Sequence, residues 1–572
     1  MMIKRKSPSE ILSIENQGRP SVQIWATGAI ASSMHPQATQ AAIDTLNSGG
    51  NAIDAAVAMG TTLCVTNSDL CGIGGDSAWL IYSAETNEYF YIDGYSKCSQ
   101  KMTTEVLEKH FGLTPETSPQ AYEEEPGFYR CEGIITSAVP GTPAAWIRAW
   151  ERFGKLPLRT ILSTAILLAE NGFPVNRFLA GRLEDAKNKL YAFDSSRKIF
   201  LKPTGKAFGE GETLVQGELA ETLKRIAKDG HSGFYQGTTA EMIVDYSRAH
   251  GGVYTLKDFS DYDVVWRLTQ ISNYRGFDVM ASSYPTSGIH MLQMLKIMEN
   301  FDMKALGYHS PESLHVMIEA AKLSRADRRG FAGDPDFVKV PLEKILDKDY
   351  AAERAKLIKF GTAKSAKPGI ITGLGIGPAV LKGKPYKGGT THFVVRDGEG
   401  NIVSATQTVG GAFGCGEVAE GTGIVMNDRT WWMALKNSPN VVAPNRRANI
   451  GHCPSIILKD GRPFMAVGSP GGDGIIQYVM QTVVNVIDYG LNIQEAIEAP
   501  RFRSMGLGNE VIMEKRIDKK VRDTLRSWGH KITDRPDWTM ELGGVVGFMM
   551  DLKTGNILGG YDPRRNSLAG GY

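Results

Sequence analysis

The sequence predicts an α+β fold in which helices built from small residues pack against strands. Three features indicate it. Residues 36–66 hold two alanine-rich helical segments separated by Gly49-Gly50, and residues 72–82 lead from a glycine turn into an apolar strand. Residues 391–408 read as two strands around a short loop, and strands dominate the rest of the chain. Helices and strands therefore both contribute to the core.

The first helix presents Ala38, Ala42 and Leu46 on one face, and a second helix begins near Asn51. The run SAVPGTPAAW (137–146) reads as a turn that leads into a helix. Residues 150–350 are mostly helical by pattern, and residues 274–301 read as a strand, a turn and a long helix. Residues 359–389 are glycine-rich and basic, which predicts a mobile surface segment.

Composition excludes several kinds of partner. The 572 residues include 64 basic and 62 acidic side chains, a net charge of +2, which gives no electrostatic case for nucleic acid or an anionic membrane. We find no secretory signal and no apolar stretch long enough to cross a bilayer. The six cysteines show no CxxC spacing. A reduced, cytoplasmic protein without disulfides or zinc motifs is expected.

The two strands predicted over residues 391–408 form a hairpin whose threonines could have a structural or a catalytic role. If it is symmetric about Glu399, Thr390 lies opposite Thr408 and His392 opposite Thr406, unless a bulge shifts the register. Cross-strand threonine pairs are common and often only structural. However, Thr390 follows a glycine-rich segment and opens a strand, as an N-terminal nucleophile would after self-cleavage at Gly389-Thr390.

The freed α-amine of such a threonine, with an ordinary pKa of about 8, serves as general base for its own hydroxyl. Cleavage also requires a strained peptide, and glycine at position 389 tolerates unusual backbone angles.

A second candidate is the run GSPGGDG (468–474), which opens an apolar helix. It lacks the Lys-Ser/Thr of a phosphate-binding P-loop, so that interpretation is weak. A plain strand-to-helix turn is one alternative. The other is an oxyanion hole, in which the N–H groups of Gly471 and Gly472 face a developing negative charge.

Motifs along nearly the whole chain resemble the γ-glutamyltransferase family of N-terminal nucleophile (Ntn) hydrolases. They include GGNAIDAAVA (49–58), VPGTPAAW (139–146), GFYQGTTAE (233–241), ADRRGFAGDPDFVKVP (326–341), TTHFVVRDGEGNIVSAT (390–406), GSPGGDGII (468–476), EAPRF (498–502) and the terminal DPRRNSLAGGY. The resemblance implies a four-layer αββα sandwich, with two stacked antiparallel sheets between helices. It also implies self-cleavage into a large subunit, residues 1–389, and a small one, residues 390–572, which share one domain.

The resemblance assigns roles to the residues already singled out. Thr390 would be the nucleophile, Thr408 its hydroxyl partner, and Gly471 and Gly472 the oxyanion donors. The reaction would pass through a threonyl acyl-enzyme resolved by water or an acceptor amine. A dimer of processed heterodimers is possible.

The chain departs from the family where a γ-glutamyl group would be held. Tyr95 and Ser96 replace an Arg-Glu pair, Ile450 and Gly451 replace two serines, and Gly410 replaces an asparagine. Arg429 and Trp432 stand where polar and acidic residues hold the ammonium group. An arginine there repels an ammonium group, so we expect a different acyl specificity, as in oxamate amidohydrolases or cephalosporin-type acylases.

In that reading, Arg429 binds a substrate carboxylate, and Tyr95 and Trp432 form an aromatic wall. The alternatives are a surface or interdomain salt bridge for Arg429 and core packing for at least one of Trp431 and Trp432. The competing functions are a γ-glutamyl transferase or hydrolase acting on glutathione-like amides, and a non-catalytic, uncleaved scaffold.

No cofactor or metal is expected. His290 and His392 have no neighbours at metal-ligand spacing. The acidic side chains of Asp327, Asp334 and Asp336 fall close to Arg325, Arg328 and Arg329 in the sequence. We expect these six residues to form one buried charge network that supports the fold.

Overall fold

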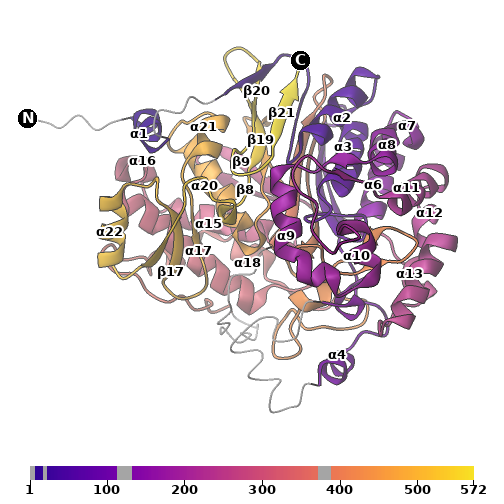
Figure 1. The fold of residues 1–572 in the computed structure, drawn as a ribbon. Coiled ribbons are helices and arrows are strands. Elements are labelled where there is room, and N and C mark those ends of the chain that lie inside the picture. The colour runs from indigo at the N-terminus through magenta and orange to yellow at the C-terminus, as the bar shows by residue number, and fades with distance from the viewer. Residues whose placement is uncertain (1–6, 17–21, 113–131, 372–387) are drawn as a thin grey trace, which may run out of the picture.

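The computed structural model describes residues 7–16, 22–112, 132–371 and 388–572. Two seven-stranded sheets face each other, with helices on both outer sides (Figure 1). The predicted four-layer αββα architecture is confirmed, and all strand pairs within the two large sheets are antiparallel.

Each large sheet combines strands from distant parts of the chain. Sheet A has the order β1 (Ile24–Ala26), β20 (Ile557–Gly560), β19 (Val546–Met550), β15 (Arg462–Gly468), β14 (Ser455–Lys459), β9 (Phe277–Ala281) and β8 (Gln270–Tyr274). Sheet B has the order β21 (Leu568–Gly571), β2 (Ile30–Ser33), β10 (Gly388–Arg396), β11 (Ile402–Gly411), β3 (Asp76–Ser83), β4 (Glu88–Gly94) and β7 (Val265–Arg267). Residues before and after position 389 thus interleave in both sheets.

Alternating side chains build separate cores on the two faces of each sheet, as the two-residue strand repeat requires. In β10, Val394 points between the sheets, whereas Phe393 and Val395 point toward the helices over sheet B. In sheet A, Ile456 points inward, and Ile457 faces the other helical layer. Strands in both sheets are therefore apolar on both faces.

Helices from the first half of the chain cover sheet B, at the right of Figure 1. Their bounds are α2 (Pro36–Asn47), α3 (Ala52–Thr66), α6 (Thr142–Phe153), α7 (Leu158–Ile161), α8 (Ser163–Asn171), α9 (Arg177–Tyr191), α10 (Asp194–Phe200), α11 (Gly217–Asp229), α12 (Ser232–Tyr235), α13 (Gly237–Ala249) and α14 (Leu256–Ser260). The predicted helix pair is confirmed, and Asn51 caps the second helix by accepting two backbone N–H bonds.

Sheet A is covered by α15 (Gly288–Met298), α17 (Pro311–Phe331), α20 (Ile475–Ile487) and α21 (Ile493–Glu498). Around this layer lie α1 (Pro8–Glu15), α16 (Met303–Leu306), α18 (Leu342–Ile345), α19 (Lys348–Ala355), α22 (Lys519–Ser527) and a small sheet of β16 (Phe502–Ser504), β17 (Glu510–Glu514) and β18 (Lys531–Arg535). The strand, turn and helix predicted over 274–301 correspond to β9 and α15.

In the first part of the segment predicted to be mobile, residues 359–371 lie mostly at the surface, as expected, but they are hydrogen-bonded to the rest of the protein. Residues 359–371 pack on the protein: Ala366 and Ile371 are buried, and the N–H of Gly369 donates to Asp327 Oδ1 at 2.7 Å. Backbone hydrogen bonds outweigh the shortage of large apolar side chains here. Residues 372–387 lie outside the described part of the chain.

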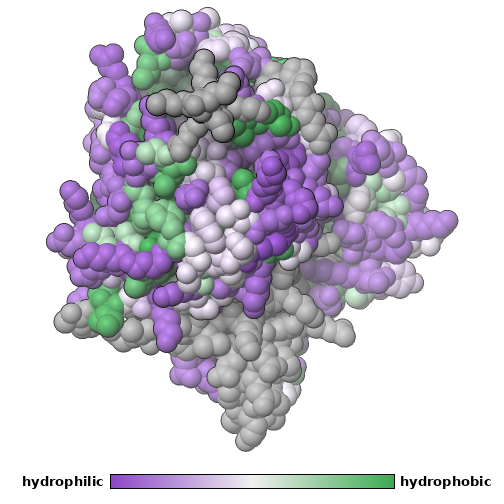
Figure 2. Space-filling view, turned by 90° about the vertical axis from the view of Figure 1, so that its left-hand side faces the viewer, coloured by the Kyte–Doolittle hydropathy of each residue, from purple (hydrophilic) through white to green (hydrophobic). Residues whose placement is uncertain are grey.

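Hydrophilic residues cover much of the face shown in Figure 2, with apolar groups between them. In the described ranges, no helix combines the length and the apolar character needed to cross a bilayer.

Candidate functional site

The two threonines meet at an irregularity in the pairing of β10 and β11. The predicted register is confirmed as far as Thr391, because His392 pairs with Thr406 and Thr391 with Gln407, but the predicted cross-strand pair of Thr390 and Thr408 is not formed. The register shifts between Gly389 and Thr391, so a bulge falls on Thr390 itself. A bulge re-aims the side chain that it carries, and this one directs the Thr390 hydroxyl toward the peptide bond before it.

A chain of hydroxyl groups reaches the carbonyl of Gly389. Thr390 Oγ1 lies 2.8 Å from Gly389 O and 3.2 Å from Thr408 Oγ1. The Thr408 hydroxyl donates to the same carbonyl and accepts the N–H of Gly410 at 2.9 Å. Thr390 is 4% exposed, so these bonds form away from most water. The geometry can polarise the Gly389 carbonyl and carry a proton from Thr390 toward it.

Position 389 requires glycine because neighbouring backbone leaves no space for a side chain, not because its backbone angles are unusual. It is not among the residues with positive φ. A Cβ at this position would lie 2.9 Å from the carbonyl oxygens of both Asp69 and Gly411. Two backbone segments therefore approach this residue too closely for a side chain.

Gly410 leaves room for a carboxylate. Its φ is +101°, and a Cβ there would lie 1.7 Å from Asp428 Oδ1. Asp428 accepts the N–H of Gly411 at 3.0 Å and the indole N–H of Trp432 at 2.9 Å. Both the backbone angle and the packing thus require glycine at position 410.

Arg429 is buried against an acidic residue of sheet B. It contacts Asp76 through two nitrogens, and Nη2 lies 3.1 Å from Asp76 Oδ1. Asp76 stands opposite Thr408 in the sheet. Burial raises the pKa of Asp76 to about 6, although Arg429 pulls it down. Arg429 therefore forms a salt bridge, as the alternative expected, but its pair with Asp76 lies in the interior rather than on the surface.

The aromatic residues take different positions. Arg429–Trp432 form a 3₁₀ turn, η2, rather than a strand, so strand alternation does not separate the two tryptophans. Trp431 is buried in the core between the sheets, as expected for one of the pair, and Trp432 is part-buried. The Arg429 guanidinium lies 5.7 Å from the Trp432 ring centre. Tyr95 is 1% exposed, and its ring centre lies 5.3 Å from that of His452.

The glycine run 468–474 turns from β15 into α20 through a 3₁₀ turn, η3 (Gly472–Gly474), that contacts β10. Gly471 and Gly472 have φ values of +130° and +59°. A Cβ on Gly468 would clash with the ring of His392, and one on Gly451 would lie 2.8 Å from Gly472 O. The turn is therefore held against the hairpin by close backbone packing.

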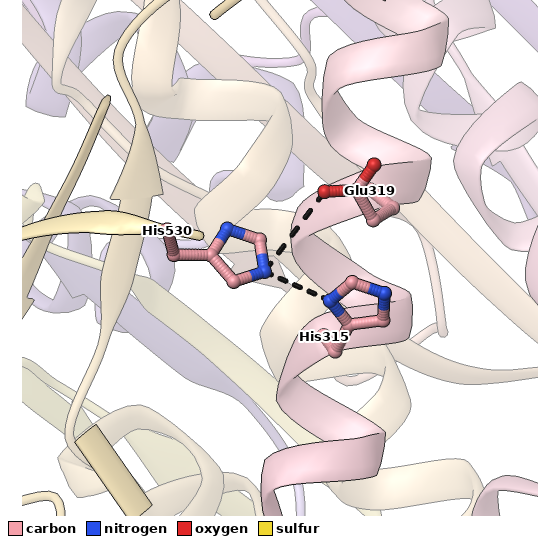
Figure 3. A group of neighbouring side chains, drawn as sticks. All are labelled: His315, Glu319 and His530. Atoms are coloured by element: carbon pink, nitrogen blue, oxygen red, sulfur yellow. Dashed lines mark hydrogen bonds and ion pairs between the residues drawn. The ribbon is translucent and has the colours of Figure 1, made fainter. Parts of the chain in front are cut away.

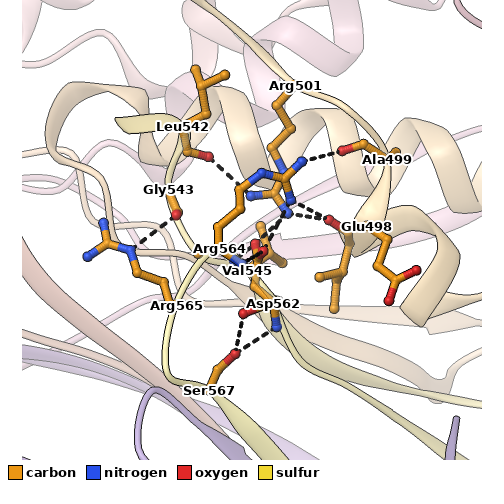
Figure 4. Close-up of polar contacts among 12 residues, drawn as sticks. Glu498, Ala499, Arg501, Leu542, Gly543, Val545, Asp562, Arg564, Arg565 and Ser567 are labelled. Carbon is orange, nitrogen blue, oxygen red and sulfur yellow. Dashed lines mark hydrogen bonds and ion pairs between the residues drawn. The ribbon is translucent and has the colours of Figure 1, made fainter. Parts of the chain in front are cut away.

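The C-terminal DPRRNS run makes polar contacts with the segment 542–545 (Figure 4). Asp562 accepts the N–H of Val545 at 2.8 Å, and Arg565 Nε donates to Gly543 O at 3.2 Å. A Cβ on Gly471 would lie 3.2 Å from the Cα of Gly543. The terminal motif thus fixes the segment on which the glycine turn rests.

The predicted single charge network of Asp327, Asp334 and Asp336 with the helix arginines is wrong. Arg325 and Arg328 instead contact Asp473, at 2.7 and 3.1 Å. The three acidic residues pair elsewhere: Asp327 with Arg354, Asp334 with the N–H of Arg447, and Asp336 with Arg267. The arginines of α17 point toward the glycine turn, which sequence spacing could not show.

One cluster resembles a metal site. His315 and Glu319 lie one turn apart on α17, and with His530 they place three potential ligand atoms within 4.8 Å (Figure 3). However, His315 Nδ1 lies 2.8 Å from His530 Nε2, and the Lys322 ammonium contacts the Glu319 carboxylate. An ammonium group so placed opposes a divalent cation. These residues fit a hydrogen-bonded network better than a metal site.

Asp76, Asp428 and Asp473 were not among the predicted site residues. Each of them directly follows or precedes a predicted feature: Asp76 follows the glycine turn that begins at residue 72, Asp428 precedes Arg429, and Asp473 follows Gly472. A carboxylate beside a candidate site residue was the available signal.

The chain matches known proteins over nearly its full length. The sequence model described as Gamma-glutamyltranspeptidase matches residues 38–572. The Glutathione hydrolase proenzyme of Escherichia coli (strain K12) is 36% identical over 564 residues, which cover 96% of this chain and 93% of that protein. The Acylase ACY 1 proenzyme of Pseudomonas sp. (strain SE83) is 36% identical, with 88% and 87% covered. Cephalosporin acylase from Bacillus halodurans has a TM-score of 0.87 at 29% identity, with 97% of both chains covered.

The αββα fold and these relatives agree on one class of protein, in which a proenzyme processes itself and then cleaves amide bonds. The chain belongs to the gamma-glutamyltranspeptidase family of Ntn hydrolases.

Proposed function

We propose that Thr390 is the nucleophile, first in cleavage of its own chain and then in hydrolysis of an amide substrate. The observation that supports this most strongly is the contact of both the Thr390 and the Thr408 hydroxyl with the carbonyl oxygen of Gly389. In this proposal Thr408 relays the proton, and Gly471 and Gly472 are the oxyanion donors; the contact of their turn with β10 supports this assignment.

Self-cleavage begins when Thr390 Oγ attacks the carbonyl carbon of Gly389. The Thr390 proton passes to Thr408 Oγ, and the Thr408 proton neutralises the carbonyl oxygen as it becomes an alkoxide. The C–N bond to Thr390 then breaks, its nitrogen takes the proton from the hydroxyl formed on the former carbonyl oxygen, and an ester joins Gly389 to the Thr390 side chain. Water hydrolyses this ester, which leaves a carboxylate on Gly389 and a free amine and hydroxyl on Thr390.

The same atoms then act on the substrate. The α-amine of Thr390 takes the proton from its own hydroxyl, and the oxygen attacks the amide carbon. The N–H groups of Gly471 and Gly472 stabilise the oxyanion, and the amine leaves with the proton. Water, or an acceptor amine, resolves the acyl-enzyme and regenerates Thr390.

Residues 1–389 and 390–572 would stay together as large and small subunits after cleavage. Strands from both parts are hydrogen-bonded to each other in both sheets, so separation would expose two sheets and three cores. Association of two processed heterodimers remains a prediction.

We further propose a non-glutamyl acyl group. Gly410 has no room for a polar side chain beside Asp428, and Gly451 lies against Gly472 O where the family resemblance implies serine. The positive charge of Arg429 is already paired with the carboxylate of Asp76. In this account Arg429 orients Asp76 beside Thr408, and Trp432 supplies an aromatic wall with Tyr95 behind it.

The alternative is hydrolysis of a γ-glutamyl amide. It is favoured by the similarity to the Escherichia coli glutathione hydrolase proenzyme over 96% of this chain. In that case Asp428 would hold the substrate ammonium in place of the missing polar groups.

A substrate comparison separates the two. Processed protein is assayed with γ-glutamyl, oxalyl and aryl-acyl anilides, with Thr390→Ala as the inactive control. We expect kcat/KM for a non-glutamyl anilide to exceed that for the γ-glutamyl compound at least tenfold, which corresponds to about 1.4 kcal/mol. A preference for the γ-glutamyl compound would establish the alternative.

A further inference from the structure

An unusual charge cluster lies directly beside the proposed oxyanion donors. Asp473 follows Gly472, and its carboxylate bridges two arginines of α17, with Arg325 Nη2 on Oδ2 at 2.7 Å and Arg328 Nη1 on Oδ1 at 3.1 Å. Arg325 is 6% exposed, whereas the Asp473 side chain keeps 28% of its surface in contact with solvent. The cluster is therefore mostly interior but open to water at the carboxylate.

Positive charge exceeds negative charge around Asp473. Burial raises the pKa of this carboxyl, but Arg325, Arg328, Arg503 and Arg329 together hold it well below its usual range. Burial and the nearby Arg325 lower the pKa of Arg329 to about 9, which shows how poorly this environment tolerates further positive charge. Four guanidinium groups thus share the field of one carboxylate.

Two donors of the cluster are also unsatisfied. Within the described residues, the buried Nε atoms of Arg325 and Arg503 have no hydrogen-bond partner. A buried N–H donor without a partner costs about 1–3 kcal/mol, and more when the group is charged.

We propose that this arginine cluster (Arg325, Arg328, Arg329 and Arg503) binds an anionic group of the amide substrate, a carboxylate or a similar oxyanion. Guanidinium groups favour such ligands because their planar N–H donors match two oxygens at once. The cluster adjoins the turn of Gly471 and Gly472, and η3 in that turn contacts β10, the strand that carries Thr390. This inference rests on the proposed function of that turn.

A purely positioning role is the competing explanation. Arg325 and Arg328 could hold Asp473 only to fix the glycine turn. That role uses two arginines and predicts equal effects on charged and neutral substrates. Anion binding predicts that the effect of a substitution depends on substrate charge.

The kinetic test uses matched substrates. Arg325→Met and the charge-retaining Arg325→Lys are assayed with two pairs of anilides: one pair with a carboxylate or its methyl ester in the acyl group, the other with the same exchange on the leaving aniline. We expect Arg325→Met to lower kcat/KM 10- to 100-fold for the carboxylate of one pair, with less than threefold change for its ester. Arg325→Lys should retain part of the preference, and the exposed control Arg248→Met all of it.

A binding test keeps this inference separate from the proposed chemistry. Titration calorimetry of the uncleaved Thr390→Ala protein with glutarate and with inorganic phosphate measures anion binding without turnover. Binding of either anion that weakens at least tenfold on Arg325→Met supports the cluster. No binding of either anion, or equal losses of kcat/KM on charged and neutral substrates, would overturn it. Anion binding by the Thr390→Ala protein, together with a wild-type chain that never cleaves itself, would refute the proposed function but not the anion site.

Discussion

The hydroxyl of Thr408 donates a hydrogen bond to the carbonyl oxygen of Gly389, the residue whose peptide bond precedes Thr390. The same hydroxyl is held in place by the N–H of Gly410. One side chain thus connects the bond to be cut, the attacking oxygen and the glycine that follows on β11.

Removing this hydroxyl should slow self-cleavage more than it disturbs the fold. We predict that Thr408→Val lowers the cleavage rate about 10²–10³-fold, the usual effect of losing one oxyanion donor. Thr406→Val is the matched control, because Thr406 is equally buried on the same strand but bonds His392 instead. Time courses of fragment formation on denaturing gels measure both. Equal slowing by the two substitutions would contradict a specific role for Thr408.

Gly410 should tolerate no side chain. In the uncleaved Thr390→Ala background, we predict that Gly410→Ala lowers the unfolding free energy by well over the ~1 kcal/mol of left-handed backbone strain, because its Cβ would meet Asp428. Gly211→Ala isolates the strain alone, since Gly211 has a φ of +82° and open space around it. Guanidinium denaturation gives both values. A Gly410→Ala cost no larger than that of Gly211→Ala would show that Asp428 moves aside.

The Arg429–Asp76 pair should behave as a buried ion pair. In the same background, we predict that Arg429→Met costs about 3–5 kcal/mol, because it leaves Asp76 buried without its partner. Adding Asp76→Asn should recover part of this loss. Arg148→Met, which breaks a solvent-exposed pair with Asp263, should cost at most about 1 kcal/mol. An Arg429→Met cost as small as this control would mean that water reaches the pair.

The histidine network of Figure 3 should make stability depend on acid. Burial lowers the pKa of His530 to about 3 and that of His315 to about 4. Histidine binds protons more readily in the unfolded chain, at an ordinary pKa of about 6.5. Stability from these residues is therefore complete above that pH and is lost as the pH falls toward 3–4.

In the Thr390→Ala background, the unfolding free energy should fall by about 2 kcal/mol more than in its His530→Gln derivative between pH 7 and pH 5. His110→Gln, which changes an exposed histidine, is the matched control. Denaturation curves at the two pH values provide the measurement. Identical pH dependence with and without His530 would show that its imidazole accepts a proton in the folded state.

Much of the fold was accessible from the sequence because the relevant signals are local. The helix pair at 36–66 follows from alanine spacing and the Asn51 cap, and the register of β10 and β11 from a symmetric loop. The four-layer arrangement came from the family resemblance. The bulge that aims Thr390 was raised only as something that could alter the register, because it depends on crowding around Gly389.

Ion pairs between residues far apart in the chain could not be predicted from the sequence. Arg429 and Asp76 lie far apart in the chain, and so do Arg325 and Asp473, so spacing could not match them. The arginines of α17 were therefore grouped with acidic residues nearby in the sequence rather than in space. The packing of residues 359–371 was missed for the same reason, since their backbone partners come from distant segments.

The nucleophile is tested most directly by intact-mass and N-terminal sequence measurements on purified, aged protein. We predict two fragments, residues 1–389 and residues 390–572, the second with Thr390 as its free N-terminus. We also predict a single uncleaved 62.4 kDa chain for Thr390→Ala and slower cleavage for Thr390→Ser. A wild-type chain that stays whole, or a Thr390→Ala chain that still divides at Gly389 and hydrolyses amides, would contradict these predictions.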